Sequence, residues 1–456
     1  MSIAPSTPTA AVAPDIRAAR LSAEEYANNF AEATPPLGAS QAVLEAERCL
    51  YCFDAPCATA CPTSIDVPSF IRRIAEGNLR GAARTILESN PLGGMCARVC
   101  PTENLCEAVC VRNTQEARPI AIGRLQRHAV DALMQNKQPQ IFNRAASTGK
   151  KVAVVGAGPA GLACAHTLAR HGHSVTVFDA RAKAGGLNEY GLATYKTPDN
   201  FAQREVRWLL DIGGIEVRHQ WRLESLIQLE ALRKEYDAVF LGLGLASTQR
   251  LGIAGEELQG VQDAVDFIAS LRQTADVATV PMGRRVIVIG GGMTAVDAAV
   301  QSKLLGAKVV HMVYRRGPQS MSASRAEQEW AQTNGVVLHH WLAPMEILGH
   351  DGHACAVRFA EQALVDGKLA PTGRDITWEA DMVFKAIGQT LGNPVLTHAG
   401  LAMQDGRIAT DAEGQTNLPG VWAGGDCRAG GLDLTVEAVE HGKRSALAIH
   451  AQLSQA

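Results

Sequence analysis

The chain has 456 residues, of which 46 % are hydrophobic and 20 % charged, and its formal net charge at pH 7 is −3. This length predicts two or three domains, and the near balance of 43 basic and 46 acidic residues argues against nucleic-acid binding. No apolar run reaches the roughly 18 residues that span a bilayer, and residues 1–14 lack the pattern of a secretory signal. We therefore expect a soluble, cytoplasmic protein with a disordered tail at 1–14.

Residues 15–145 are expected to form an all-helical domain. The stretch Leu21–Glu25 has the pattern of a capped helix start, and apolar residues recur at helical spacing over 69–75 and 122–134. The polar stretch 136–150 is typical of a linker.

Eight of the eleven cysteines lie in this helical segment. They form two closely spaced groups of four, which are Cys49, Cys52, Cys57 and Cys61, then Cys96, Cys100, Cys106 and Cys110. Clustered thiols in a large chain without a signal peptide indicate metal binding, and the Cys-Pro pairs at 61–62 and 100–101 are typical of iron–sulfur proteins. Structural zinc and inert thiols are the alternatives. Zinc sites usually pair two Cys-x2-Cys elements or add histidine, whereas no histidine lies between the first and last of these cysteines.

From Lys151 the pattern changes to alternating strands and helices. A strand at 152–155 runs into a Gly-x-Gly-x-x-Gly turn, a helix follows, and the next strand ends in an acid. In such a unit the glycines allow a tight turn, close approach of a pyrophosphate and helix–strand packing, while the acid accepts ribose hydroxyls. The residues concerned are Gly156, Ala157, Gly158, Pro159, Ala160, Gly161 and Asp179.

A second unit starts with a strand at 285–289. Its turn comprises Gly290, Gly291, Gly292, Met293 and Thr294. The following strand ends not in an acid but in Arg315 and Arg316, which suit a 2′-phosphate and favour NADP unless they form a solvated turn. Two complete units in one chain are strong evidence for dinucleotide binding.

Near the C-terminus, a strand ends in Gly424, Gly425 and Asp426, and a helix starts near Thr435. The aspartate suits the hydroxyl groups of a flavin cofactor, and the start of a helix stabilises negative charge on a reduced flavin ring. An ordinary α/β crossover is the alternative.

From about Glu45 to His450 the chain resembles the N-terminal half of dihydropyrimidine dehydrogenase, which in bacteria is a separate NAD(P)H-oxidising subunit. Glutamate synthase small subunits share this architecture and are the near alternative. The resemblance is carried by the stretches Arg48–Cys57, Cys61–Thr63, Asn90–Cys96, Val99–Thr102, Leu105–Cys106 and Ile122–Gln126. Gln126 occupies the place of a cluster-binding glutamine, where glutamate synthase small subunits generally have glutamate.

The resemblance implies an α/β fold with two Rossmann-like dinucleotide-binding domains, one inserted in the other, preceded by an all-α domain that carries two iron–sulfur clusters. The implied bounds are 15–145 for the bis-[4Fe-4S] domain, 146–247 and 389–456 for the FAD-binding domain, and 248–388 for the NAD(P)-binding domain.

The resemblance also implies which residues bind each group. One cluster is assigned to Cys49, Cys52, Cys57 and Cys110. The other is assigned to Cys61, Cys100, Cys106 and Gln126, which leaves Cys96 as a core thiol. FAD is assigned to Gly156–Gly161, Asp179, Lys196, Asp426 and Thr435, with a solvated lysine as the alternative for Lys196. NAD(P) is assigned to Gly290–Thr294, Arg315, Arg316, Ala386, Ile387 and Gly388. Ser322 stands where NADPH-using relatives have arginine, which favours NAD.

The implied function is hydride transfer from NAD(P)H to FAD, followed by single-electron transfer through the two clusters. The expected acceptor is a partner subunit containing FMN and iron–sulfur clusters, which reduces uracil or thymine within a heteromer, expected as a heterotetramer. We predict no catalytic acid or base, no nucleic-acid partner and no membrane association. The chain ends soon after His450 without a segment for the FMN barrel, so we expect that barrel on the second polypeptide. A different class of function is a non-enzymatic, metal-stabilised interaction module.

Overall fold

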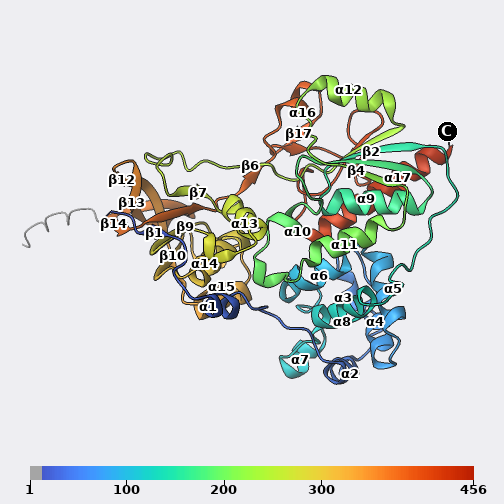
Figure 1. The fold of residues 1–456 in the computed structure, drawn as a ribbon, viewed down its shortest axis with the longest axis horizontal. Coiled ribbons are helices and arrows are strands. Elements are labelled where there is room, and N and C mark those ends of the chain that lie inside the picture. Colours follow the sequence, from blue (N-terminus) through green and yellow to red (C-terminus); the bar gives the residue numbers. More distant parts are fainter. Residues whose placement is uncertain (1–12, 456) are drawn as a thin grey trace, which may run out of the picture. The chain divides into compact units, whose positions relative to one another are not determined.

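A computed structural model of the chain describes residues 13–455, so most of the disordered tail expected at 1–14 lies outside the described residues. The described chain forms two compact units (Figure 1). The smaller unit comprises residues 13–31, 192–194 and 248–388, and the larger unit comprises 32–191, 195–247 and 389–455. No helix among residues 13–455 is both long and apolar enough to cross a bilayer.

The larger unit begins with a group of helices, which together with the loops between them carry all eight clustered cysteines. They are α2 (Ala39–Glu47), α3 (Pro56–Thr59), α4 (Val67–Ala75), α5 (Leu79–Ser89), α6 (Gly93–Val99), η1 (Thr102–Asn104), α7 (Arg112–Glu116) and α8 (Ile122–Met134). The helices expected at 69–75 and 122–134 are thereby confirmed. Asp66 and Asn78 cap α4 and α5, and the helices α4, α5 and α8 each bury one apolar face, as with Phe70, Ile86 and Leu125.

The rest of the larger unit is built on a five-stranded parallel sheet with the strand order β19-β5-β2-β3-β4. The strands are β2 (Lys151–Val155), β3 (Ser174–Phe178), β4 (Ile215–Arg218), β5 (Ala238–Leu241) and β19 (Val421–Ala423). The accompanying elements are α9 (Pro159–Arg170), α10 (Leu187–Tyr190), η2 (Thr194–Lys196), α11 (Phe201–Leu210), α12 (Leu226–Glu235), α16 (Pro394–His398), β17 (Met403–Gln404), β18 (Arg407–Ile408) and α17 (Thr435–Gln455). Strands β2 and β5 are almost wholly buried, because helices cover both faces of such a sheet.

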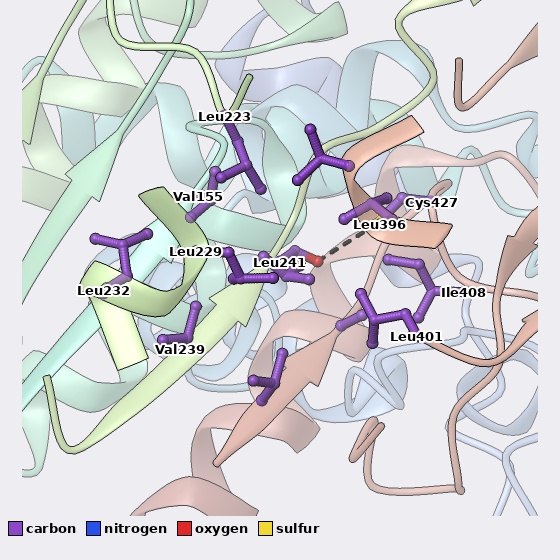
Figure 2. Close-up of a cluster of buried hydrophobic side chains, with 14 of the residues drawn as sticks. Val155, Leu223, Leu229, Leu232, Val239, Leu241, Leu396, Leu401, Ile408 and Cys427 are labelled. Atoms are coloured by element: carbon purple, nitrogen blue, oxygen red, sulfur yellow. Dashed lines mark hydrogen bonds between the residues drawn. The ribbon is translucent and has the colours of Figure 1, made fainter. Parts of the chain in front are cut away.

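One hydrophobic core joins two distant stretches of the chain in this unit (Figure 2). Leu229 and Leu241 from the first stretch pack with Leu396 and Ile408 from the second, and the Cys427 thiol donates a hydrogen bond to the Leu241 carbonyl at 3.3 Å. The chain leaves this unit at β6 (Ser247–Thr248) and returns at β16 (Gln389–Thr390). The smaller unit is therefore an insertion in the larger one, and the predicted fold class is confirmed.

The smaller unit has a parallel sheet of order β11-β10-β9-β15-β7 and an antiparallel sheet of order β12-β13-β14. Its strands are β1 (Ile16–Arg17), β7 (Val261–Asp263), β8 (Met282–Gly283), β9 (Arg285–Ile289), β10 (Val309–Tyr314), β11 (Val337–His340), β12 (Leu342–His350), β13 (His353–Val365), β14 (Lys368–Glu379) and β15 (Met382–Lys385). Its helices are α1 (Ala23–Asn29), α13 (Ala264–Gln273), η3 (Val277–Thr279), α14 (Met293–Leu304), η4 (Pro318–Ser320) and α15 (Arg325–Thr333). The predicted capped helix start is the Ser22–Glu25 capping box of α1, and residues 13–31 join this unit through the pairing of β1 with β8.

Candidate functional site

Four thiols of the helical region line one pocket. Cys49, Cys52, Cys57 and Cys110 line a cavity of about 30 Å³, with apolar neighbours that include Val67, Ile71, Ile120 and Ile122. Tyr51 and Ala55 have positive φ angles of 50° and 39°, which turn the loop between the first three thiols. Burial raises the pKa of Cys49 and, with repulsion from Cys49 and Cys110, raises the pKa of Cys57 to about 11. A raised pKa favours the neutral thiol at Cys49 and Cys57, and bound iron would favour the thiolate at both.

The thiols of Cys61, Cys96, Cys100 and Cys106 also lie close together. A hydrogen bond with Cys96, together with burial and the proximity of Cys106 and Cys61, raises the pKa of Cys100 well above its ordinary value. Burial likewise raises the pKa of Cys106. Cys96, which the family resemblance leaves as a core thiol, thus contacts Cys100 within this group.

Gln126 is buried on α8, with 7 % of its surface exposed. Its side-chain nitrogen donates a hydrogen bond to the Gly93 carbonyl, at the start of α6, at 2.7 Å. Cys100 directly follows that helix. The structure therefore connects Gln126 to the cysteine-bearing helix through the Gly93 peptide. The choice between Gln126 and Cys96 as a fourth ligand stays a prediction.

The donor set fits clusters better than single metal ions. Among residues 13–455, no three or more Cys, His, Asp or Glu side chains are placed to hold one metal ion. A [4Fe-4S] cluster differs because each of its four ligands binds a different iron atom, so the ligands lie further apart. The thiols of Cys49, Cys52, Cys57 and Cys110 line one pocket, and those of Cys61, Cys96 and Cys106 lie close to Cys100, which suits two such clusters.

The first glycine turn is fixed by packing at two of its glycines. Gly156 has a φ angle of 109°, and a Cβ there would lie 2.1 Å from the Gly242 carbonyl oxygen. A Cβ on Gly161 would lie 1.8 Å from the Gly156 carbonyl oxygen. A Cβ on Gly158, in contrast, would meet only the Gly186 Cα atom, at 3.8 Å. Gly158 thus leaves open space at the N-terminus of α9, where a pyrophosphate would be bound.

Asp179 follows β3 and holds this turn directly. Its carboxylate accepts the Ala157 N–H at 2.6 Å through one oxygen and the Arg181 N–H at 2.7 Å through the other. A carboxylate has about four acceptor positions, so it keeps capacity for ribose hydroxyls. The sequence pattern indicates only the ribose role, because a side-chain bond back to the turn leaves no trace in residue spacing.

The other flavin candidates also belong to the larger unit. Asp426 is largely buried after β19, and burial together with Asp433 raises its pKa to about 7. The Thr435 hydroxyl, at the start of α17, donates a hydrogen bond to the Asn188 side-chain oxygen at 2.9 Å. Lys196 ends η2 and is partly buried.

In the smaller unit, the second glycine turn links β9 to α14. A Cβ on Gly290 would lie 2.2 Å from the Ala386 carbonyl oxygen, so this turn packs against the predicted segment Ala386–Gly388. A Cβ on Gly292 would lie 3.1 Å from the Ser322 hydroxyl. Arg315 and Arg316 directly follow β10 and are exposed. The predicted nucleotide residues after β9, β10 and β15 therefore share one edge of the sheet.

A set of contacts that the sequence does not reveal ties the cysteine-bearing helices to the flavin-type fold. Glu205 of α11 is completely buried and accepts the Gly94 and Met95 N–H groups at 2.7 and 3.2 Å. Lys443 of α17 donates to the Ser89 carbonyl at 2.7 Å. Arg98 of α6 stacks 3.5 Å from the ring centroid of Phe201. A single glutamate within an amphipathic helix pattern normally indicates an exposed position, so no sequence signal identifies Glu205.

Comparisons with known proteins agree with this arrangement. A family model described as pyridine nucleotide-disulphide oxidoreductase matches residues 150–442, and one described as dihydropyrimidine dehydrogenase domain II, 4Fe-4S cluster, matches residues 26–138. The NAD-dependent dihydropyrimidine dehydrogenase subunit PreT of Salmonella typhimurium is 35 % identical and aligns over 94 % of this chain and 98 % of its own. The glutamate synthase [NADPH] small chain of Escherichia coli is 34 % identical over 91 % and 92 %.

Among solved structures, FprA of Mycobacterium tuberculosis in complex with NADPH superposes with a TM-score of 0.54, at 19 % identity, over 67 % of this chain and 85 % of its own. That likeness concerns the fold alone. The family models and relatives establish FAD, NAD(P)H and 4Fe-4S clusters as the cofactors, and an electron-input role. The chain belongs to the pyridine nucleotide-disulphide oxidoreductase family, in the group with an N-terminal 4Fe-4S domain that includes dihydropyrimidine dehydrogenase subunits and glutamate synthase small chains.

Proposed function

We propose that this chain is the electron-input subunit of a dihydropyrimidine dehydrogenase. It takes hydride from NAD(P)H and passes single electrons to an FMN-containing partner subunit, which reduces uracil or thymine to the 5,6-dihydropyrimidine. The observation that carries the proposal is that the cysteine-bearing helices and the first glycine turn belong to one compact unit, joined by the Glu205 and Lys443 contacts. FAD supplies the exchange between two-electron and one-electron chemistry.

Within this proposal, the role of the chain's own residues is to bind and orient the FAD cofactor. The N-terminus of α9 holds the FAD pyrophosphate beside Gly158, while Asp179, Lys196 and Asp426 hold polar groups of that cofactor. The start of α17 at Thr435 stabilises negative charge on the flavin ring. Hydride transfer needs no catalytic acid or base from this chain, and the proton left behind once both electrons have passed to the clusters would be released to solvent.

We assign one cluster to the pocket formed by Cys49, Cys52, Cys57 and Cys110, and the other to Cys61, Cys100, Cys106 and Gln126. The convergence of the first four thiols on one pocket supports the first assignment. The second is supported by the proximity of Cys61 and Cys106 to Cys100 and by the hydrogen bond from Gln126 to Gly93.

The glutamine at position 126 favours the assignment to dihydropyrimidine dehydrogenase over the assignment to glutamate synthase. An amide can donate to the Gly93 carbonyl, whereas an ionised glutamate, as in glutamate synthase small subunits, has no donor for it. The alternative is a glutamate synthase small chain that passes electrons to an amidotransferase partner. The 34 % identity to such a chain supports this alternative.

We propose NAD as the preferred nicotinamide cofactor. The relatives named as dihydropyrimidine dehydrogenase subunits are NAD-dependent. The small Ser322 side chain stands at the second glycine turn, where NADPH-using relatives have arginine. Arg315 and Arg316 remain available for a 2′-phosphate, so the chain could use NADPH with lower efficiency.

We place the partner subunit over the first cluster pocket. Leu50 lines that pocket and is 46 % exposed, Phe53 is fully exposed, and Val109, beside Cys110, is 43 % exposed. Apolar side chains grouped around a redox centre suit a protein contact that shortens the electron-transfer distance.

Co-expression with a candidate FMN-barrel subunit tests the proposal. The purified complex should consume uracil with NADH, whereas the single chain should oxidise NADH only with artificial acceptors. Uracil reduction by the single chain, or co-purification with an amidotransferase and NADPH-dependent glutamate formation, would refute the pyrimidine assignment. A colourless, flavin-free protein would instead support the non-enzymatic module.

A further inference from the structure

The peptide bond between Gly93 and Gly94 is held from both sides by buried side chains. Its carbonyl accepts a hydrogen bond from the Gln126 side-chain nitrogen at 2.7 Å. Its N–H donates to a carboxylate oxygen of Glu205, also at 2.7 Å. The two hydrogen bonds therefore form a continuous hydrogen-bonded chain, which runs from Gln126 on α8 through a single peptide group to Glu205 on α11.

The surroundings prevent this peptide from turning away. A Cβ on Gly94 would lie 2.5 Å from the Phe201 ring and 2.7 Å from a Glu205 oxygen. A Cβ on Gly93 would lie 2.6 Å from Ile86. Glu205 has no exposed surface, and its second oxygen also accepts the Met95 N–H, at 3.3 Å. Close packing thus fixes the geometry of both bonds.

Hydrogen bonds in a line polarise one another, and bonds to an ionised acceptor are the stronger ones. When Glu205 attracts the Gly94 N–H, the Gly93 carbonyl oxygen becomes more negative and holds the Gln126 amide nitrogen more firmly. Because an amide group is planar, fixing its nitrogen also fixes the direction of its oxygen. The same polarisation makes that oxygen more electron-rich and thus a better ligand for iron.

We propose that Glu205 is a positioning residue for Gln126, which it orients and polarises through the Gly93–Gly94 peptide toward the second cluster. This inference rests on the ligand set proposed above. It assigns a redox role to a residue of the flavin-type fold that lies outside the helical domain.

The charged groups that face Glu205 are Arg98 of α6 and Asp131 of α8. Burial raises the pKa of Glu205 to about 8, against the opposing effect of the Gly94 and Met95 N–H groups. Polarisation of Gln126 should therefore be weaker at pH 7 than at pH 9.

Mössbauer spectroscopy of the iron-57-labelled, anaerobically purified chain tests this inference. The wild type should show one iron with a non-thiolate ligand, and Gln126→Ala should alter that signal. Glu205→Gln should shift the same signal and leave the other cluster and the flavin content unchanged. The signal should also change between pH 7 and pH 9 in the wild type, a measurement that needs no variant, and stay constant in Glu205→Gln.

Lys443→Met is the matched control, because it removes the nearby contact to Ser89 and leaves the Gly93–Gly94 peptide untouched. It should lower thermal stability without shifting the iron signal. The inference is overturned if Glu205→Gln matches the wild type at both pH values, if Lys443→Met shifts the signal equally, or if Cys96→Ser alters it and Gln126→Ala does not. Absence of iron or flavin in the wild type would instead overturn the proposed function.

Discussion

Asp426 illustrates how burial changes a single residue. Its pKa is raised from 3.8 to about 7 by burial and by Asp433 and Glu437, against the opposing effect of Arg407. Between these two pKa values the folded apoprotein binds a proton that the unfolded chain releases, so the free energy of unfolding should fall as pH rises from about 4 to 7. Asp426→Asn should remove this component, as measured by urea denaturation of the apoprotein across that pH range. Equal pH slopes in both proteins would contradict this prediction.

Arg315 and Arg316 allow a test of nicotinamide selectivity. Replacing both with alanine should lower kcat/KM for NADPH by about tenfold, because each guanidinium can pair with the 2′-phosphate, and should change the NADH value less than about twofold. Steady-state assays with an artificial acceptor measure both. The control is Arg325→Ala, another exposed arginine of the same unit. Equal losses for both nucleotides would show that the arginines do not contact the 2′-phosphate.

At the residue scale, the sequence predicts which residues are candidates for binding clusters and cofactors better than it predicts the contacts that these residues make. The spacing groups Cys61 with the first three cysteines, whereas the family resemblance replaces it with Cys110. The pocket is lined by Cys49, Cys52, Cys57 and Cys110, and their role as ligands stays a prediction. The turn-holding bonds of Asp179 and the buried position of Glu205 arise from tertiary packing, which no residue spacing encodes.

At the scale of the elements, the glycine turn between β2 and α9 allows two roles to be tested separately. One glycine is needed for packing, and another is expected to let the cofactor approach the backbone. Gly161→Ala should destabilise the apoprotein, because its Cβ would lie 1.8 Å from the Gly156 carbonyl oxygen. Gly158→Ala should leave apoprotein stability within about 1 kcal/mol and mainly weaken FAD binding, because its Cβ meets no atom closer than 3.8 Å. Thermal denaturation and flavin titration of the two variants provide the comparison. Unchanged FAD affinity in Gly158→Ala would show that the pyrophosphate does not approach this glycine.

Protein stability should also depend on the side-chain volume at the contact between α6 and α11. Gly94→Ala places a methyl group 2.5 Å from the Phe201 ring and should cost about 1–3 kcal/mol of stability. Adding Phe201→Leu should restore part of that loss, which a double-mutant cycle measures by chemical denaturation. Strictly additive losses would mean that the two side chains do not compete for this space.

Elements with strong local signals were predictable, whereas their assembly was not. The β2–α9–β3 unit and the α1 capping box follow from glycine spacing and capping residues, and the structure has both. The sequence predicts a helical domain from residue 15, but residues 13–31 belong to the smaller unit, where β1 (Ile16–Arg17) pairs with β8. A two-residue strand such as β1 has too few residues for a recognisable periodicity.

For the whole molecule, the family resemblance anticipates the insertion of one dinucleotide-binding fold in the other. The core shared by Leu241 and Leu396 explains it physically, since neither stretch alone could bury those side chains. The same unit contains both groups of clustered cysteines and the first glycine turn.

Anaerobic stopped-flow spectroscopy of the complex with the FMN-containing partner tests the central claim most directly. In the wild type, NADH should reduce the FAD of this chain and then the partner's FMN. In Cys57→Ser, which removes a proposed ligand of the first cluster, FAD reduction should keep its rate while FMN reduction is lost. FMN reduction at the wild-type rate in that variant would contradict electron transfer through the clusters.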